Sequence, residues 1–375
     1  MEKNIFFPDY KNSILALSNS LLKKYGVKTK HPSLKSLDQK IKPYKNVILM
    51  IFDGLGMNIL NQHLKENDFL RKHLFQELSS VYPPTTVAAT TSIHSGLAPI
   101  EHGWIGWMQY FKEYDRVIEL FRNTDFYSAE KVVNGPLIAE QVLAYKDIYT
   151  QIVEKNKDVH FSKIYPSWAE NGVSSLNEMN DRIINTLKTN EKNIILAYWT
   201  EPDYSIHRQG VQSQTAHNLV QEINKSVENL FSQISNDTII LITADHGIVD
   251  ADEIFLNDIE GFSECFKNPP SMEVRLASFF IKEDKREQFL TLFNRHFKED
   301  FILYTHDEYI NSGLLGKGNM HPKIEDFVGD YVAISHGKRA ICYYTDKEKA
   351  ICLKADHAGI TKEEMLVPLI ILERK

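Results

Sequence analysis

Four short apolar runs divide the sequence, with polar or helix-like segments between them. The runs are Asn46–Phe52 (NVILMIF), Asn193–Trp199 (NIILAYW), Thr238–Thr243 (TIILIT) and Leu366–Leu372 (LVPLIIL). Each is almost continuously aliphatic or aromatic and short, a pattern typical of strands that are buried on both faces. The sequence therefore predicts a mainly parallel central sheet. Because proline cannot donate to a strand ladder, Pro368 predicts an edge strand or a strand with an irregular start.

Segments with helical periodicity lie between these runs. One apolar face recurs every three or four residues and consists of Leu219, Ile223, Val227, Leu230 and Ile234. A second helix is predicted over Val87–Gly96, because it follows Pro83-Pro84 and ends at a glycine suited to the residue after a helix. Buried strands that alternate with helices indicate the α/β class, with helices flanking the sheet.

The rest of the chain divides into two further parts. Residues 1–45 contain one amphipathic helical pattern and a connection rich in lysine and proline, which predicts an N-terminal wrapping segment. Residues 252–327 carry strand-like and helix-like runs of their own and predict an inserted α+β lid subdomain. The catalytic α/β core would then consist of residues 46–251 and 328–375. Within the latter part, residues 329–335 and 339–345 predict a β-hairpin.

Composition excludes several classes of protein. The 375 residues include 43 lysines and arginines and 50 aspartates and glutamates, a net charge of −7, which argues against binding to a nucleic acid polymer or an anionic membrane. Cys265, Cys342 and Cys352 form no C-x-x-C pair and predict neither a disulfide framework nor a thiolate zinc site. The first apolar run stops at Pro8, too early for a signal-peptide core, so we expect a cytoplasmic protein.

Acidic and histidine side chains follow the apolar runs. After the first three runs stand Asp53, then Asp203 and His207, then Asp245 and His246, while His357 precedes the last run. Ligands bind beyond the carboxyl ends of parallel strands, and carboxylates and imidazoles are ligands of zinc and manganese. Taken alone, Asp53-Gly54 is typical of a turn. Taken alone, Asp203 and His207 have the spacing of a side-chain pair on the surface of a helix. Together, the six side chains predict a metal site at one edge of the sheet.

Two hydroxyls precede the helix predicted at Val87–Gly96. Thr85 and Thr86 both suit an N-cap, whose side chain accepts a hydrogen bond from the first turn of the helix. The same position also suits a nucleophile, because free amides and the helix dipole stabilise negative charge on oxygen and on a bound phosphate. A threonine hydroxyl needs a base or a metal ion to become nucleophilic at neutral pH.

These residues carry a resemblance to a known family. The segments are DGLG (53–56), PPTTVAATTSIHSGLAPIEHG (83–103), EPDYSIHRQG (201–210), TADHG (243–247) and DHAGITKEEMLVPLI (356–370). They resemble the alkaline phosphatase superfamily and, within it, the type I phosphodiesterase/nucleotide pyrophosphatase family. The resemblance covers roughly residues 46–250 and 351–375. It implies an alkaline-phosphatase-like fold and phosphoester hydrolysis through a covalent phosphothreonine.

The same resemblance implies two divalent metal ions, Zn²⁺ in the first place and Mn²⁺ as the alternative. Asp203, His207 and His357 would hold the metal that activates water. Asp53, Asp245 and His246 would hold the second metal, which also binds the oxygen of the nucleophile Thr86. Thr86 is preferred to Thr85 because it lies ten residues before Gly96, the spacing found in the family.

Three functions remain open at this point. The first is hydrolysis of phosphodiesters or nucleotide pyrophosphates, and the second is hydrolysis of phosphomonoesters or phosphonates. The third is a non-catalytic interaction protein that metal ions stabilise. The expected partner is a small phosphorylated substrate, with a nucleotide as a candidate, whereas no pattern indicates the oligomeric state. Trp104, Trp107 and Tyr110 would either stack on a base or serve as ordinary core and surface aromatics.

Overall fold

The computed structural model describes residues 4–189, 191–350 and 352–374. Its main sheet has six strands in the order β2-β17-β8-β1-β7-β6. Strands β6, β7, β1 and β8 run parallel, and β17 runs antiparallel to both of its neighbours. The mainly parallel central sheet is therefore confirmed. The bounds are β1 (Asn46–Phe52), β2 (Leu74–Ser79), β6 (His160–Ile164), β7 (Asn193–Trp199), β8 (Thr238–Thr243) and β17 (Leu366–Glu373).

Strand β17 is an interior strand, so the edge position considered for it is wrong. It lies between β2 and β8. Pro368 pairs with Glu77 of β2, whereas pairing with β8 begins only at Ile370. Pro368 therefore lies before the part of β17 that pairs with β8, so its lack of an N–H group breaks no hydrogen bond to β8. The register with β2 shifts between Leu369 and Ile370, so the alternative of an irregular start describes the strand.

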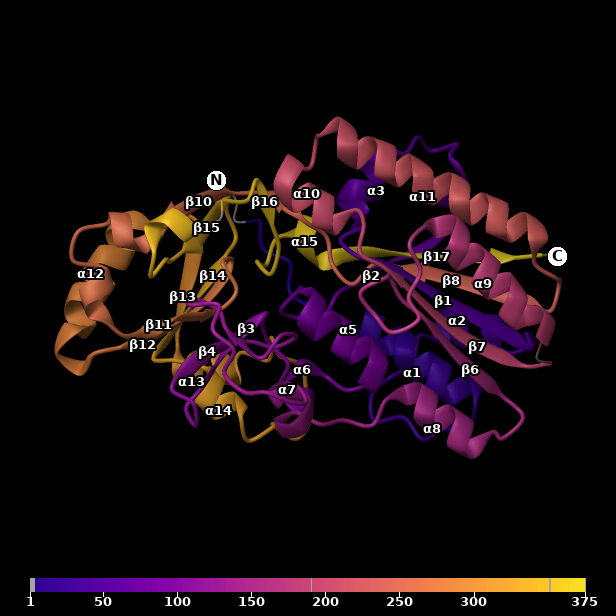
Figure 1. Cartoon of the computed structure of the whole chain (residues 1–375), viewed down its shortest axis with the longest axis horizontal. Coiled ribbons are helices and arrows are strands. Elements are labelled where there is room, and N and C mark those ends of the chain that lie inside the picture. The colour runs from indigo at the N-terminus through magenta and orange to yellow at the C-terminus, as the bar shows by residue number, and fades with distance from the viewer. Residues whose placement is uncertain (1–3, 190, 351, 375) are drawn as a thin grey trace.

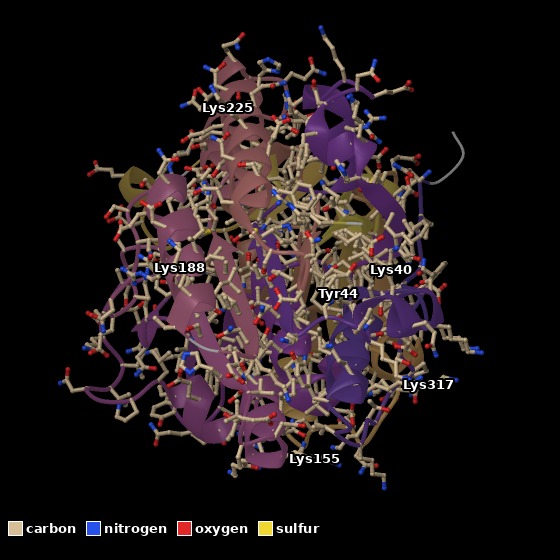
Figure 2. The ribbon with its side chains drawn as sticks, turned by 90° about the vertical axis from the view of Figure 1, so that its right-hand side faces the viewer. Lys40, Tyr44, Lys155, Lys188, Lys225 and Lys317 are labelled. Atoms are coloured by element: carbon tan, nitrogen blue, oxygen red, sulfur yellow. The ribbon has the colours of Figure 1, made fainter. Side chains whose placement is uncertain are left out.

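Helices cover both faces of the main sheet. Figure 1 shows α3, α9 and α11 on one face and α1, α5 and α8 on the other, and Figure 2 gives the view from the end that carries this sheet. In α11, the predicted face is buried at Ile223, Val227 and Leu230. The bounds are α1 (Ile14–Lys24), α3 (Met57–His63), α5 (Thr86–Ser95), α8 (Ile148–Lys155), α9 (Leu176–Thr189) and α11 (Gln214–Gln233).

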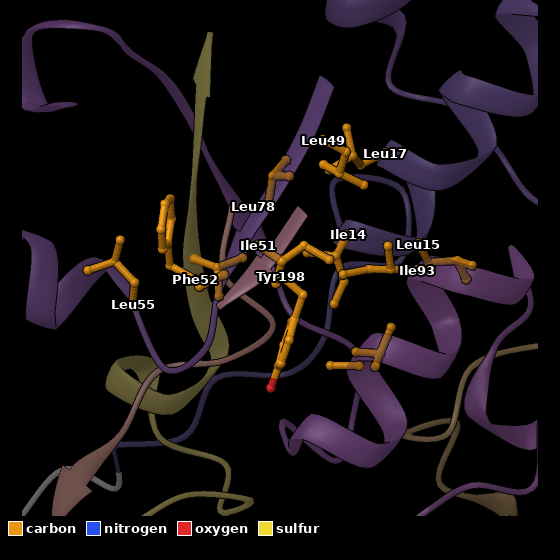
Figure 3. Close-up of a cluster of buried hydrophobic side chains, with 14 of the residues drawn as sticks. Ile14, Leu15, Leu17, Leu49, Ile51, Phe52, Leu55, Leu78, Ile93 and Tyr198 are labelled. Atoms are coloured by element: carbon orange, nitrogen blue, oxygen red, sulfur yellow. The ribbon is translucent and has the colours of Figure 1, made fainter. Parts of the chain in front are cut away.

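The core between α1, α5 and the sheet is aliphatic. Figure 3 shows Ile14 and Leu17 of α1 and Ile93 of α5 beside Leu49 and Ile51 of β1, and all five side chains are fully buried. Burial of each such side chain stabilises the fold by about 1.5–3 kcal/mol. This packing holds α5, with Thr86 at its start, against the sheet.

A second sheet of seven strands lies beside the main one, in the order β13-β14-β12-β11-β3-β4-β5 (Figure 1). Three of its strands come from the segment 252–327, but the others come from residues 108–125 and 331–335, so this sheet draws on a longer part of the chain. The domain boundaries stay a prediction. The bounds are β3 (Met108–Phe111), β4 (Arg116–Glu119), β5 (Thr124–Asp125), β11 (Phe266–Met272), β12 (Leu276–Ile281), β13 (Phe301–Thr305) and β14 (Tyr331–Ser335).

The predicted β-hairpin at 329–345 is wrong. Strand β14 pairs with β12 and β13, whereas β15 (Arg339–Cys342) pairs in parallel with β10 (Asp252–Phe255). The physical reason lies between the two strands, where the guanidinium of Arg275 donates to the carbonyl oxygens of Gly337 at 3.0 Å and Arg339 at 3.1 Å. These bonds turn the chain away from β14.

The remaining elements are short. Among the described residues, no helix has both the length and the apolar character needed to cross a bilayer. The elements are α2 (Lys35–Ile41), α4 (Phe69–Lys72), α6 (Pro99–His102), α7 (Ile138–Val142), α10 (Asp203–Gln209), α12 (Arg286–His296), α13 (His306–Asn311), α14 (Ile324–Phe327), α15 (Lys362–Met365), β9 (Val249–Asp250), β16 (Ala355–Asp356) and the 3₁₀ helices Leu256–Asp258, Ser263–Cys265, Glu283–Lys285 and Lys347–Lys349.

A fully buried ion pair joins the second sheet to the segment before β17. Arg275 Nε donates to Glu364 Oε1 at 2.7 Å, and an Arg275 terminal nitrogen donates to Oε2 at 2.9 Å. Both side chains are 0% exposed. Glu364 also accepts from Gly359 N and from the Thr361 hydroxyl, each at 2.7 Å. The pair therefore fixes the loop that begins two residues before Gly359, at His357.

Replacement of Glu364 by glutamine tests this pair. Glu364→Gln leaves a buried guanidinium without its counter-charge, and we expect the free energy of unfolding to fall by about 3–5 kcal/mol. Urea denaturation measures the change. The control is Arg286→Gln, which breaks a pair whose arginine is 52% exposed, and a loss below about 1 kcal/mol is expected there. Equal small losses in both variants would show that the buried pair does not hold the sheets together.

Candidate functional site

Loops at the carboxyl ends of β1, β7 and β8 bring the predicted site residues together. Asp53 N donates to the Trp199 carbonyl at 2.9 Å, and Asp203 N donates to the Asp53 carbonyl at 3.1 Å. Gly54 N donates to Asp245 Oδ1 at 3.2 Å. At Gly54, φ is +68° and a Cβ would stand 2.8 Å from the Cβ of Asp203. Only glycine therefore allows the first strand end to pack against the second.

The ligand atoms form two overlapping clusters. Those of Asp203, His207 and His357 lie within 4.8 Å of one another, and so do those of Asp53, Asp203 and His246. Asp203 thus belongs to both clusters, whereas the resemblance gave it to one.

Asp245 lies at the edge of the second cluster. Its Oδ2 atom is 3.7 Å from His246 Nε2, while its Oδ1 atom is occupied by backbone amides. All six residues named as metal ligands from the sequence are therefore at one place, where their assignment as ligands remains a prediction.

Backbone carbonyls set the tautomers of the three histidines. His207 Nδ1 lies 2.7 Å from the Ala355 carbonyl, and His246 Nδ1 lies 3.0 Å from the Gly247 carbonyl. Because a carbonyl only accepts, both Nδ1 atoms carry a proton, and both Nε2 atoms face the carboxylates. His357 makes its backbone bond to Pro84, and its Nδ1 has no partner. Each histidine thus directs one ring nitrogen at the clusters, and that nitrogen can bind a cation once it is unprotonated.

Three buried atoms in these clusters have no hydrogen-bond partner. They are Asp203 Oδ1, Asp245 Oδ2 and His357 Nδ1. Buried polar atoms in folded proteins are almost always paired, so such a concentration is typical of a site that binds an ion or water. The donors are carboxylate oxygens and imidazole nitrogens without sulfur, a set that fits Zn²⁺ or Mn²⁺.

The electrostatics of the site also favour cations. Burial, together with the charges of Asp245 and Asp203, holds the pKa of Asp53 well above its ordinary value. Burial likewise raises the pKa of Asp245. Burial also acts to raise the pKa of Asp203, but the neighbouring His207 outweighs it and the pKa is lowered. Asp53 and Asp245 therefore hold their protons more tightly than free carboxyl groups do, unless further positive charge neutralises them.

Thr86 is the first helical residue of α5 rather than its N-cap. Its Oγ1 atom lies 3.1 Å from His246 Nε2 and 3.5 Å from Asp53 Oδ1. The N-cap is Thr85, whose hydroxyl points elsewhere and donates to Glu273 Oε1 at 2.6 Å. The helix ends at Gly96, where φ is +68°, as expected for the residue after a helix. Of the two threonines, only Thr86 faces the clusters.

Sequence reasoning missed two residues of the site. The Tyr198 hydroxyl donates to Asp53 Oδ2, and Figure 3 shows the ring projecting from β7 beside Ile51 and Phe52. Because Tyr198 stands inside an apolar run, its spacing indicated core only. Glu273 lies in the segment 252–327, where no motif marked it. Burial raises the pKa of Glu273 to about 7.

The three candidate aromatics have different surroundings. Trp104 is buried, and its indole nitrogen donates to the Leu143 carbonyl at 3.0 Å. The Trp107 indole donates to Glu119 Oε1 at 3.1 Å, while its backbone amide donates to Glu273 Oε1 at 2.7 Å. The Tyr110 hydroxyl donates to Asp115 at 2.7 Å. Trp104 is a core residue, and Trp107 borders the site through its backbone.

Comparisons with known proteins agree with this geometry. The family model described as type I phosphodiesterase / nucleotide pyrophosphatase matches residues 47–359. No curated protein sequence matches the chain. Among solved structures, murine ectonucleotide pyrophosphatase / phosphodiesterase 5 is 17% identical with a TM-score of 0.65, over 86% of this chain and 87% of that one. An inactive variant of the murine protein in complex with AMP gives the same values. The human protein is 15% identical with a TM-score of 0.64 and the same coverage.

Metal removal and reloading test the clusters. We expect two equivalents of Zn²⁺ per chain by elemental analysis, because the ligand atoms form two groups. Bound metal should raise the free energy of unfolding, by about 2.7 kcal/mol per site at a hundredfold excess over the dissociation constant. Asp203→Asn should lower the affinity of both sites, whereas His207→Ala should affect one. Fewer than one equivalent in the reloaded wild type would contradict the metal assignment.

Proposed function

Because the chain belongs to the type I phosphodiesterase / nucleotide pyrophosphatase family and is thus a phosphoester hydrolase, we propose that it cleaves small phosphodiesters at a di-metal site through a phosphothreonine on Thr86. Membership of a hydrolase family argues against the non-catalytic interaction protein considered from the sequence. The structural neighbours are 15–17% identical to this chain, so they show a shared fold and not a shared substrate.

The observation that carries the proposal is the position of the Thr86 hydroxyl. It lies 3.1 Å from His246 Nε2, at the first residue of α5 and beside two clusters of metal-ligand donors. The N-terminus of a helix favours negative charge, so it suits both an alkoxide and a phosphoryl group. A hydroxyl that served only as an N-cap would point back over its own helix.

Each residue of the site would have a distinct role in the reaction. Asp203, His207 and His357, together with Asp53, Asp245 and His246, would hold two divalent cations, Zn²⁺ first and Mn²⁺ as the alternative. Bound there, such ions neutralise the carboxylates and lower the pKa of nearby hydroxyl and water oxygens. Thr86 Oγ1 attacks phosphorus, the bond to one alcohol or nucleotide breaks, and the leaving oxygen takes up a proton that replaces the one lost by the hydroxyl. The phosphothreonine that forms still carries the other ester group. Water then attacks the same phosphorus, the bond to Thr86 Oγ1 breaks, that oxygen regains a proton, and a phosphomonoester is released.

The charge of the site favours diesters over monoesters. Across the described ranges of the chain, no lysine or arginine forms an ion pair with Asp53, Asp203 or Asp245. A monoester dianion brings one more negative charge than a diester, and among the described residues these carboxylates have no lysine or arginine partner that could also offset that charge. The AMP complex of the murine relative supports a nucleotide-containing diester or pyrophosphate. The cytoplasmic location stays a prediction from the sequence.

A substrate panel tests the reaction class. We expect the Zn²⁺-loaded protein to hydrolyse bis(4-nitrophenyl) phosphate with a kcat/KM at least about tenfold above that for 4-nitrophenyl phosphate, because the chain belongs to a phosphodiesterase family. Release of nitrophenolate measures both, with 4-nitrophenyl phenylphosphonate as a third substrate. A higher kcat/KM for the monoester would favour the phosphomonoesterase alternative, and a higher one for the phosphonate would favour a phosphonate hydrolase.

Replacement of Thr86 tests the covalent step. Thr86→Ala should lower kcat by at least about three orders of magnitude while metal content stays near that of the wild type, because the ligands remain. Thr86→Ser keeps a hydroxyl and should retain part of the activity. Thr85→Ala should have a much smaller effect, because the Thr85 hydroxyl faces Glu273. Acid quench and peptide mass spectrometry should locate a phosphoryl adduct on Thr86, and a fully active Thr86→Ala variant would rule out this mechanism.

A further inference from the structure

Helix α5 begins without the side-chain cap that its sequence provides. Thr85 has the extended backbone of an N-cap, with φ −136° and ψ 149°, yet it makes no capping hydrogen bond. The other two threonine N-caps among the described residues behave differently. Thr305 accepts from Glu308 N at the start of α13, and Thr361 accepts from Glu364 N at the start of α15. The residue type is therefore not the cause.

The missing cap is explained by Glu273, which accepts a hydrogen bond from the Thr85 hydroxyl. The hydroxyl donates to Glu273 Oε1 at 2.6 Å, and the same oxygen accepts the Trp107 amide at 2.7 Å. Thr305 and Thr361 also donate to a glutamate, but that glutamate lies in the first turn of their own helix, so the hydroxyl oxygen still accepts a helix amide. Glu273 lies outside α5, and donation to it turns the Thr85 hydroxyl away from the helix.

The loop that carries Glu273 is held firmly in place. The backbone amide of Glu273 donates to the Leu276 carbonyl at 3.0 Å. Arg275, which lies two residues after Glu273, forms the buried ion pair with Glu364. On the other side Met272 packs against Gly106, where a Cβ would stand 2.7 Å from the Met272 Cα. The position of the Glu273 carboxyl is therefore fixed from both sides.

The consequence lies in the first turn of α5. The first hydrogen bond of the helix runs from Ala89 N to the Thr85 carbonyl, so the amides of Thr86, Val87 and Ala88 have no acceptor within the helix. An N-cap side chain would normally accept from the second or third of these amides. They belong to the turn that carries the Thr86 hydroxyl, so a phosphoryl group bound beside that hydroxyl would find them as donors.

We propose that Glu273 is a positioning residue, which holds the Thr85 hydroxyl away from α5 so that the amides of Val87 and Ala88 bind the phosphoryl oxygens of the substrate. The inference rests on the proposed function of Thr86. It gives the second sheet a part in the reaction, because the β11–β12 loop supplies Glu273.

Substitutions at Glu273 and Thr85 test the proposal through kcat and KM in the Zn²⁺-loaded protein. In Glu273→Ala, Thr85 is released to cap the helix, and we expect kcat to fall by roughly tenfold or more with KM changed by less than about threefold. The thermal midpoint should not fall, because a new cap stabilises the helix. Glu273→Gln keeps an acceptor for Thr85 and should retain most of the activity.

The decisive variant combines two substitutions. Thr85→Val removes the hydroxyl of the N-cap residue, so the pair Thr85→Val with Glu273→Ala should recover most of the kcat lost in Glu273→Ala alone. Glu119→Gln is the matched control, because Glu119 contacts the Trp107 indole but not Thr85. The inhibition constant of inorganic phosphate should rise in Glu273→Ala and return in the double variant, which provides a readout without turnover.

Several outcomes would overturn the inference. They are an unchanged kcat in Glu273→Ala, a double variant as impaired as Glu273→Ala, an equal loss in Glu119→Gln, or a Glu273→Ala protein that melts well below the wild type. The last would assign Glu273 to stability. Failure of the proposed function looks different, since the wild type would then not cleave diesters or Thr86→Ala would stay active.

Discussion

The repulsion among three buried carboxylates is the constraint on which the site depends. Asp53, Asp203 and Asp245 are each less than 9% exposed, and parallel strands in adjacent positions deliver them to one place. Charges in such surroundings are costly unless opposite charge lies close by. Among the described residues, histidine nitrogens and unpaired oxygens face these carboxylates, and no lysine or arginine forms an ion pair with them. Such surroundings suit bound cations.

The second sheet is coupled to that site by one short loop. Glu273 reaches the N-cap of α5, and Arg275 reaches Glu364, which in turn binds the loop that begins at His357. The proposed nucleophile, Thr86, and a proposed metal ligand, His357, thus both depend on residues only two positions apart. A displacement of the β11–β12 loop would disturb both ends together, which explains why the loop is anchored by a fully buried ion pair.

The parts that could be predicted from the sequence are those with local signals. The strands at 46–52, 193–199 and 238–243 have continuous apolar runs, and the residues that follow them meet because parallel strands end at one edge. Glu273 could not be predicted, because its partners Thr85 and Trp107 lie 188 and 166 positions away and no pattern links them. The supposed hairpin failed for a related reason, since a distant arginine decides the path of its turn.

The start and the end of α5 are stabilised by different means. A side-chain cap is worth about 0.5–2 kcal/mol, and the N-terminal end of α5 forgoes it. At the other end, Ser18 donates to the Ile93 carbonyl at 2.8 Å and Asn19 donates to the Gly96 carbonyl at 3.2 Å, both from α1. The N-terminal segment therefore secures the helix where no chemistry occurs. Because that end is fixed, the amides at the other end can remain unpaired without loosening the helix, and Thr86 stays in register with His246 and Asp53.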